Sequence, residues 1–213
     1  MDQSKPMTLR EKNRLRARQE LLDVVLDLFS EGGLSACSMD VVAKRAGASK
    51  TTAYSHFPGG VDEMLRELYI LVSQRVVASA REVHDEKTAP AEKILALAEA
   101  LLSVCAEKKV GHFYMMLSPA LSPLLEPVVG YASTAYRDMI TSDLATVGFA
   151  PEHAEPVSVL LTGAMRECAK EVAKSPGRLS EMLSIFDKLS RLIVEQFPKT
   201  CSRLQDRAAF PRG

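Results

Sequence analysis

The residues best suited to chemistry lie together at positions 46–57, in the stretch AGASKTTAYSHF. This stretch combines a lysine, a histidine and the hydroxyl groups of serine, threonine and tyrosine within about three helical turns. Such groups hydrogen-bond phosphate oxygens and base edges, and threonine also offers a methyl group to thymine. Serine and threonine are weak helix formers, so helix stability does not explain their concentration here. The stretch therefore predicts a surface that contacts duplex DNA.

Two short helices must position this surface. Ser38 and Ser49 stand where N-caps are expected, before helices at 39–45 and 50–56. Gly47, between them, suits the left-handed backbone that ends a helix. This arrangement predicts a helix-turn-helix, whose second helix enters the major groove. The exposed residues of that helix are the predicted DNA contacts: Lys50, Thr51, Thr52, Tyr54, Ser55 and His56.

Helical periodicity extends over almost the whole chain. Apolar residues recur three and four positions apart, first between Leu21 and Phe29, and glycine or proline separates successive segments. We find no strand-like alternation and no internal repeat. The composition, 46% hydrophobic and 25% charged, is that of a globular protein. The sequence therefore predicts an all-α fold of about nine helices, with later segments at 61–84, 128–147, 155–174 and 178–197.

The segment SMDVVAKRAGASKTTAYSHFPGGVDEML, residues 38–65, resembles the signature of the tetracycline-repressor (TetR) family of bacterial regulators. The shared features are, in order, an alanine in the first short helix, a glycine turn followed by serine and lysine, a Tyr-x-His-Phe ending, and glycines before the next helix. The clear match covers about residues 16–70.

The resemblance implies a homodimer that binds a palindromic DNA operator and responds to a small molecule. Carried over by position, the family's contacts fall on Ser38 and Lys50 for phosphates or base edges, Thr51 and Thr52 for the groove, and Tyr54 and His56 for the backbone. One feature departs from the family pattern, because Val61 follows Gly60 where a lysine is common. That phosphate contact is then absent or supplied by helix amides. Repression released by ligand is the family's usual behaviour, and activation or ligand-independent repression stays open.

A basic arm precedes the first apolar segment, although 27 basic and 27 acidic side chains leave the chain without net charge. Within positions 5–18 a single acid, Glu11, stands among six basic residues: Lys5, Arg10, Lys12, Arg14, Arg16 and Arg18. We assign Arg18 to the DNA contacts. A solvated, disordered terminus is the alternative interpretation of the arm.

We expect three parts: a DNA-binding domain at 1–60, a helical effector-binding and dimerisation domain at 61–198, and a flexible tail at 199–213. Thioethers and aromatic rings line adaptable apolar pockets well, which predicts a pocket for a mostly apolar or aromatic effector. The candidate lining residues are His112, Phe113, Met116, Tyr136, Met139 and Met165. Ordinary core packing is the alternative for each of them.

The last two helical segments, at about 156–174 and 178–197, carry apolar residues on more than one face. Ile185 and Leu192, for example, lie off the main stripe of the final segment. An additional apolar face predicts a second copy of the chain, in a four-helix bundle built from two subunits. Packing within one chain is the alternative.

Several classes of function lack support in the sequence. There is no G-x-S-x-G elbow, P-loop, dinucleotide fingerprint or H-E-x-x-H motif, so we expect neither an enzyme nor a metal or cofactor site. No segment suits a signal peptide or a membrane span, and four scattered cysteines indicate reduced thiols in a cytoplasmic protein. A redox sensor using Cys105 or Cys168 stays open. So does an all-helical dimer whose helix-turn-helix contacts protein instead of DNA.

Overall fold

Helices make up nearly all of the structure, as the periodicity predicts. The computed structural model describes residues 7–115 and 121–196, and this part of the chain contains ten α-helices, two short 3-10 helices and no strand. The α-helices are α1 (Leu9–Gly32), α2 (Met39–Arg45), α3 (Lys50–His56), α4 (Gly60–Asp85), α5 (Pro90–Ala106), α6 (Lys108–Met115), α7 (Ser122–Leu125), α8 (Tyr131–Thr146), α9 (Pro151–Lys174) and α10 (Leu179–Gln196).

The first helix begins earlier than its apolar stripe predicts. Thr8 and Glu11 form a capping box, in which Thr8 Oγ1 accepts from the Glu11 amide (3.3 Å) and Glu11 Oε2 accepts from the Thr8 amide (2.7 Å). The basic residues from Arg10 to Arg18 are consequently helical, so the disordered interpretation of the arm does not hold for them. Lys5 lies outside the described residues.

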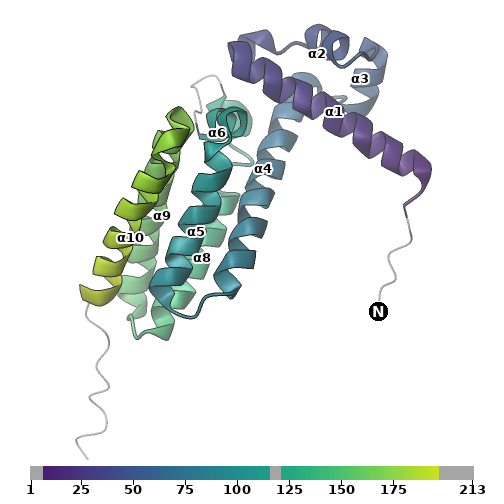
Figure 1. Cartoon of the computed structure of the whole chain (residues 1–213). Helices are drawn as coiled ribbons and strands as arrows, with labels where there is room; N and C mark the ends of the chain where they lie inside the picture. The colour runs from purple at the N-terminus through teal and green to yellow at the C-terminus, as the bar shows by residue number, and fades with distance from the viewer. Residues whose placement is uncertain (1–6, 116–120, 197–213) are drawn as a thin grey trace, which may run out of the picture.

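Helices α1, α2 and α3 form a compact trio at one end of the molecule (Figure 1). From α1, Leu22 and Val25 are buried, and they join Val42 of α2 and Ala53 of α3 in one hydrophobic core. Phe57 closes this core directly after α3 and is fully buried. The trio therefore fixes which side of α3 faces outward.

The remaining helices form a bundle below the trio. α4 leads away from α3 and runs alongside α5, while α8, α9 and α10 complete the bundle (Figure 1). The hydrophobic core continues from the trio into this bundle without interruption. The short α6 lies at the end of the bundle nearest α1, and Phe29 of α1 meets Phe113 of α6 edge-on, with ring centroids 5.3 Å apart. The two regions are thus joined through α6 as well as through α4.

Two helix starts differ from the periodicity. α8 begins at Tyr131, after Gly130 adopts a left-handed conformation (φ 105°), and not at position 128. α9 begins at Pro151, which needs no amide hydrogen-bond acceptor in the first turn, so Pro156 lies inside the helix instead of at its start. The predicted tail at 199–213 lies outside the described residues.

Candidate nucleic-acid interface and ligand pocket

Caps and a left-handed glycine hold the helix-turn-helix in shape. Ser38 Oγ accepts from the Val41 amide (3.3 Å) and Ser49 Oγ accepts from the Thr52 amide (3.0 Å), which confirms both N-caps. Gly47 has φ 66°, a backbone that other residues rarely adopt, as the turn predicts. These local signals set the length and direction of α3.

The outer face of α3 is polar and accessible. Ala53 is its one buried residue, and the others point outward or are half-buried. Thr52 Oγ1 pairs with Ser49 Oγ (2.7 Å), and Ser55 donates to the Thr52 carbonyl (2.7 Å). Within the described residues, the hydroxyl groups of Thr51 and Tyr54 have no hydrogen-bond partner. These two hydroxyls are therefore available to an external partner.

Lys50 has a protein partner that the sequence reasoning did not anticipate. Its ammonium lies 2.8 Å from Asp40 Oδ1 of α2, and both side chains are more than half exposed. The hydrogen bond and the negative charge of Asp40 raise the pKa of Lys50, so the lysine stays charged. A DNA phosphate must therefore compete with Asp40 for this ammonium.

Arg18 faces protein instead of solvent. Its guanidinium lies 4.1 Å from the centroid of the Phe57 ring, donates to the His56 carbonyl and pairs with Glu67 of α4. The side chain is only 21% exposed. Arg18 thus ties α1 to the end of α3 and the start of α4.

The other two predicted DNA contacts differ in exposure. Ser38 is exposed at the start of α2. His56 is half-buried, and its Nδ1 is buried without a hydrogen-bond partner in the described part of the chain. At the start of α4, Glu63 Oε2 already accepts from the Gly59 amide (2.7 Å), which leaves that helix end less suited to a phosphate.

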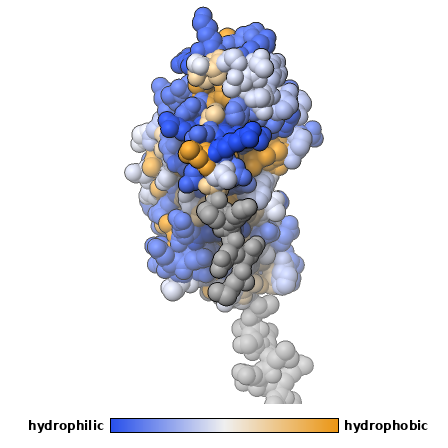
Figure 2. All heavy atoms as spheres, turned by 90° about the vertical axis from the view of Figure 1, so that its right-hand side faces the viewer, coloured by the Kyte–Doolittle hydropathy of each residue, from blue (hydrophilic) through white to orange (hydrophobic). Residues whose placement is uncertain are grey.

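The N-terminal half of α1 adds positive charge beside α3. Arg10, Lys12, Arg14 and Arg16 are all exposed, and this half of α1 projects beyond the trio (Figure 1). The face from which it projects is largely hydrophilic, with a few hydrophobic patches (Figure 2). Together with the outer face of α3 it forms a polar surface with several cations.

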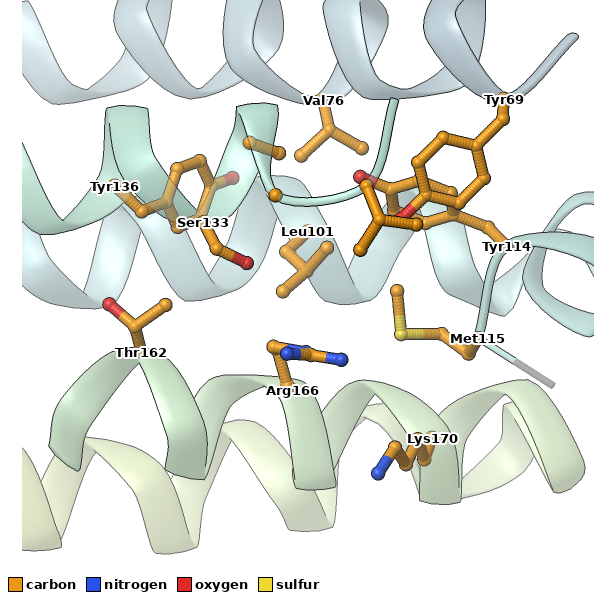
Figure 3. Close-up of a pocket in the computed structure, with 13 residues that line it drawn as sticks. Tyr69, Val76, Leu101, Tyr114, Met115, Ser133, Tyr136, Thr162, Arg166 and Lys170 are labelled. Carbon is orange, nitrogen blue, oxygen red and sulfur yellow. The ribbon is translucent and has the colours of Figure 1, made fainter. Parts of the chain in front are cut away.

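A pocket lies inside the bundle, between α4, α5, α6, α8 and α9. The pocket is narrow and opens to solvent. Tyr69 and Tyr114 lie at one end of the pocket, and Ser133 and Tyr136 lie at the other end (Figure 3). The wall that faces α4 is formed by α9. Burial raises the pKa of Tyr114 and of Tyr136, so both phenols stay neutral near pH 7.

Only part of the predicted ligand set lies at this pocket. Tyr136 lines it, while Phe113 and Met165 are fully buried in the core and Met139 packs partly against the core. His112 is exposed beside Phe29. Met116 lies outside the described residues. Three lining residues that sequence reasoning missed are spaced by four along α9, a helical stripe visible in the sequence: Thr162, Arg166 and Lys170.

The cysteines are poorly placed for redox sensing. Cys105 is fully buried, and burial raises the pKa of its thiol to about 12. Burial also raises the pKa of Cys168, which is half-buried. Because the thiolate is the reactive form, both thiols have low reactivity in this structure.

Neither a metal-binding cluster nor a helix that could span a membrane is found among the described residues. They contain no group of three or more histidine, cysteine, aspartate or glutamate side chains arranged to hold a metal ion. None of their helices is long and apolar enough to cross a membrane.

A second exposed surface is apolar. On α10, Ile185, Leu189 and Leu192 are 52%, 41% and 57% exposed and are spaced so that they share one face. On the neighbouring α9, Val159 and Leu160 are 42% and 66% exposed. We call these five residues the α9–α10 face.

Comparison with known proteins gives consistent matches. The family model described as "Bacterial regulatory proteins, tetR family" matches residues 21–68. The HTH-type transcriptional activator FasR of Mycolicibacterium smegmatis is 31% identical over 146 residues, which cover 63% of this chain and 64% of FasR. The matched region covers about two-thirds or less of the length of each of these curated relatives.

Solved structures match over more of the chain. A transcriptional regulator from Rhodococcus sp. Rha1 is 25% identical, with a TM-score of 0.68, covering 85% of this chain and 99% of the other. FadR from Bacillus subtilis, solved in complex with stearoyl-CoA, is 14% identical and has the same fold, with a TM-score of 0.67 and coverage of 84% and 99%.

Proposed function

We propose that the chain is a member of the TetR family of bacterial regulatory proteins, and that it is a homodimeric transcriptional regulator that a small molecule releases from its DNA operator. The observation that carries the proposal is the outer face of α3, which is held outward by Ala53 and offers free hydroxyls beside the cations of α1. Such a face suits contacts to base edges and phosphates in a major groove. The protein then acts wherever the operator DNA lies, which we take to be the cytoplasm.

Lys50 is proposed to bind a phosphate, displacing Asp40. Each phosphate that a protein neutralises adds about 0.9 to the slope of log affinity against log salt concentration. Lys50→Ala should therefore flatten this slope by about 0.9 for each protomer. Fluorescence anisotropy with operator DNA at several salt concentrations measures it.

Lys87→Ala is the matched control for this experiment. Lys87 is an exposed lysine just beyond the end of α4 that is farthest from α3. The same loss of charge there should leave the slope unchanged. If Lys50→Ala also leaves the slope unchanged, Lys50 contacts no phosphate.

The α9–α10 face is the proposed dimer interface. Large exposed apolar side chains on two adjacent helices are the usual composition of such a surface, and a two-fold axis would bring four helices together. Dimerisation would place two α3 helices on successive major grooves, about 34 Å apart.

The bundle pocket is the proposed effector site, with DNA affinity controlled through α4 and α6. Tyr69 of α4 and Tyr114 of α6 both line the pocket. Next to Tyr114, Phe113 packs on Phe29 of α1, and Lys109 Nζ of α6 lies 2.6 Å from Asp27 Oδ1 of α1. A ligand that separates α4 from α6 would therefore move the trio, provided that it binds the shifted state more tightly.

The effector and the direction of control are proposed as follows. A molecule with a large apolar part suits the aromatic walls, and the similarly folded FadR was solved with stearoyl-CoA. We favour repression relieved by ligand. FasR is named an activator, so a reporter gene behind the selected operator must decide the sign. Expression that falls on deletion of the regulator would establish activation.

We propose a division into residues 1–60 for DNA binding and residues 61–198 for effector binding and dimerisation. This division is based on the proposed functions of the two parts and not on separate hydrophobic cores. The hydrophobic core is continuous across position 60. Because the core is continuous, we expect helices α1–α3 to move together with α4 and α6, and not independently as a domain joined by a flexible linker would.

A further inference from the structure

The polar groups of the bundle pocket share one electrostatic character. Two cations, Arg166 and Lys170, and several hydroxyl groups line it, and no carboxylate is found among its described lining residues. All of these hydroxyls can donate a hydrogen bond, since the tyrosines stay neutral. The pocket therefore offers donors and positive charge to whatever binds there.

Arg166 is the cation without a protein counter-ion. Lys170 Nζ lies 2.6 Å from Glu167, whereas Arg166 forms no ion pair within the described residues. Arg166 is an exposed residue that lines the pocket from α9, on the side facing Leu101 (Figure 3). An exposed guanidinium beside a largely apolar pocket is suited to a carboxylate or a phosphate, which it can bind through two hydrogen bonds while the rest of the ligand occupies the pocket.

Two deeper hydroxyl groups also lack partners. Tyr136 and Thr162 are 2% and 5% exposed, and neither Tyr136 Oη nor Thr162 Oγ1 has a hydrogen-bond partner in the described part of the chain. Buried polar groups are normally hydrogen-bonded, so these two indicate a missing partner. Thr162 lies one helical turn before Arg166 on α9, and Tyr136 lines the same pocket from α8.

Further space for a long ligand adjoins the pocket on its α4 side. A second, mostly apolar groove shares Val129 with the pocket and is lined also by Ile70, Val128 and Tyr131. Ser73 of this groove donates to Tyr114 Oη of the pocket (3.1 Å), so the two spaces adjoin. An apolar tail can therefore extend from the pocket along α4.

We propose that the effector is an amphipathic organic acid, with its anionic group on Arg166, its apolar body between the tyrosines, and a hydrogen-bonding group at Tyr136 and Thr162. This inference rests on the proposed function and narrows it, because neutral hydrocarbons and organic cations are excluded as strong effectors. The anionic group can be a carboxylate or a phosphate, since both match the guanidinium.

Four probes with ten carbon atoms each test the charge requirement: decanoate, decyl phosphate, decanol and decylamine. Titration calorimetry with the full chain should show binding of one or both acids, about ten- to a hundredfold tighter than decanol, and no binding of decylamine. Which acid binds more tightly distinguishes carboxylate from phosphate. If decanol binds as tightly as the acids, or if neither acid binds below about 1 mM, the inference is wrong.

Two variants separate a ligand contact from a structural role. Arg166→Met keeps an unbranched apolar stem without the guanidinium and should weaken acid binding about tenfold or more while leaving decanol unaffected. Arg81→Met, on an exposed part of α4 away from the pocket, is the control and should change neither. Tyr136→Phe should weaken binding severalfold without lowering the melting temperature of the free protein, because the hydroxyl has no partner to lose.

Measuring operator binding without ligand distinguishes failure of this inference from failure of the proposed function. If wild-type protein binds its operator but shows no preference for acids, this inference fails and the proposed function stands. If the protein binds no operator at all, the proposed function fails first. An Arg166→Met variant that binds acids as tightly as wild type contradicts the inference directly.

Discussion

Replacing Phe57 with alanine should lower the free energy of unfolding by about 3–5 kcal/mol, within the range measured for phenylalanine in protein cores. Phe57 is fully buried at the end of α3, and the Arg18 guanidinium lies over its ring. Truncation would leave a cavity and remove the surface against which Arg18 packs. Because α3 depends on this site for its position, operator affinity should fall with stability.

Urea denaturation followed by circular dichroism measures the loss, and anisotropy measures DNA binding. Phe57→Leu is the matched control, since it keeps most of the apolar volume and should lose much less than the alanine variant. A Phe57→Ala protein as stable as wild type would mean that Phe57 does not hold the trio together.

Placing glutamate at both Leu160 and Leu192 should convert the proposed dimer to a monomer and weaken operator binding by about 10²- to 10⁴-fold. The two leucines are 66% and 57% exposed in the single chain, so the substitutions disturb no internal packing. Burying two carboxylates per protomer in a symmetric interface is costly. A monomer contacts one half-site only and loses the avidity that two linked half-sites provide.

Sedimentation velocity gives the oligomeric state, and anisotropy gives the affinity. Lys87→Glu, which also adds negative charge but lies away from the α9–α10 face, is the control and should remain dimeric. If the double variant is still a dimer, the interface lies elsewhere. If wild type is a monomer at micromolar concentration, the apolar face has another partner.

Local features of the fold were predictable because they depend on neighbours in sequence. Ser38 and Ser49 were identified as caps and Gly47 as a left-handed turn, since each acts within a few residues of itself. The early start of α1 was missed because a run of basic residues without an apolar stripe suggested disorder. The spacing of Thr8 and Glu11 is nevertheless that of a capping box.

Tertiary partners could not be predicted in the same way. Arg18 reaches Glu67 across 49 positions, and no short-range pattern relates the two residues. The composition of the pocket was missed for a related reason. Large apolar residues such as Phe113 and Met165 pack into the core, while the pocket wall is formed by polar residues of α9 such as Arg166. Selecting residues by hydrophobicity therefore identified the core more readily than the cavity.

Selection of bound fragments from random duplex DNA, with wild-type protein and with Thr51→Ala, tests most directly whether the outer face of α3 reads DNA. We expect wild type to enrich an inverted repeat whose half-sites are about 10 base pairs apart, centre to centre. Thr51→Ala should relax the preference at one base step in each half-site, by about 1–3 kcal/mol if the contact is good. Failure of the wild-type protein to enrich any sequence at low salt would contradict this role for α3.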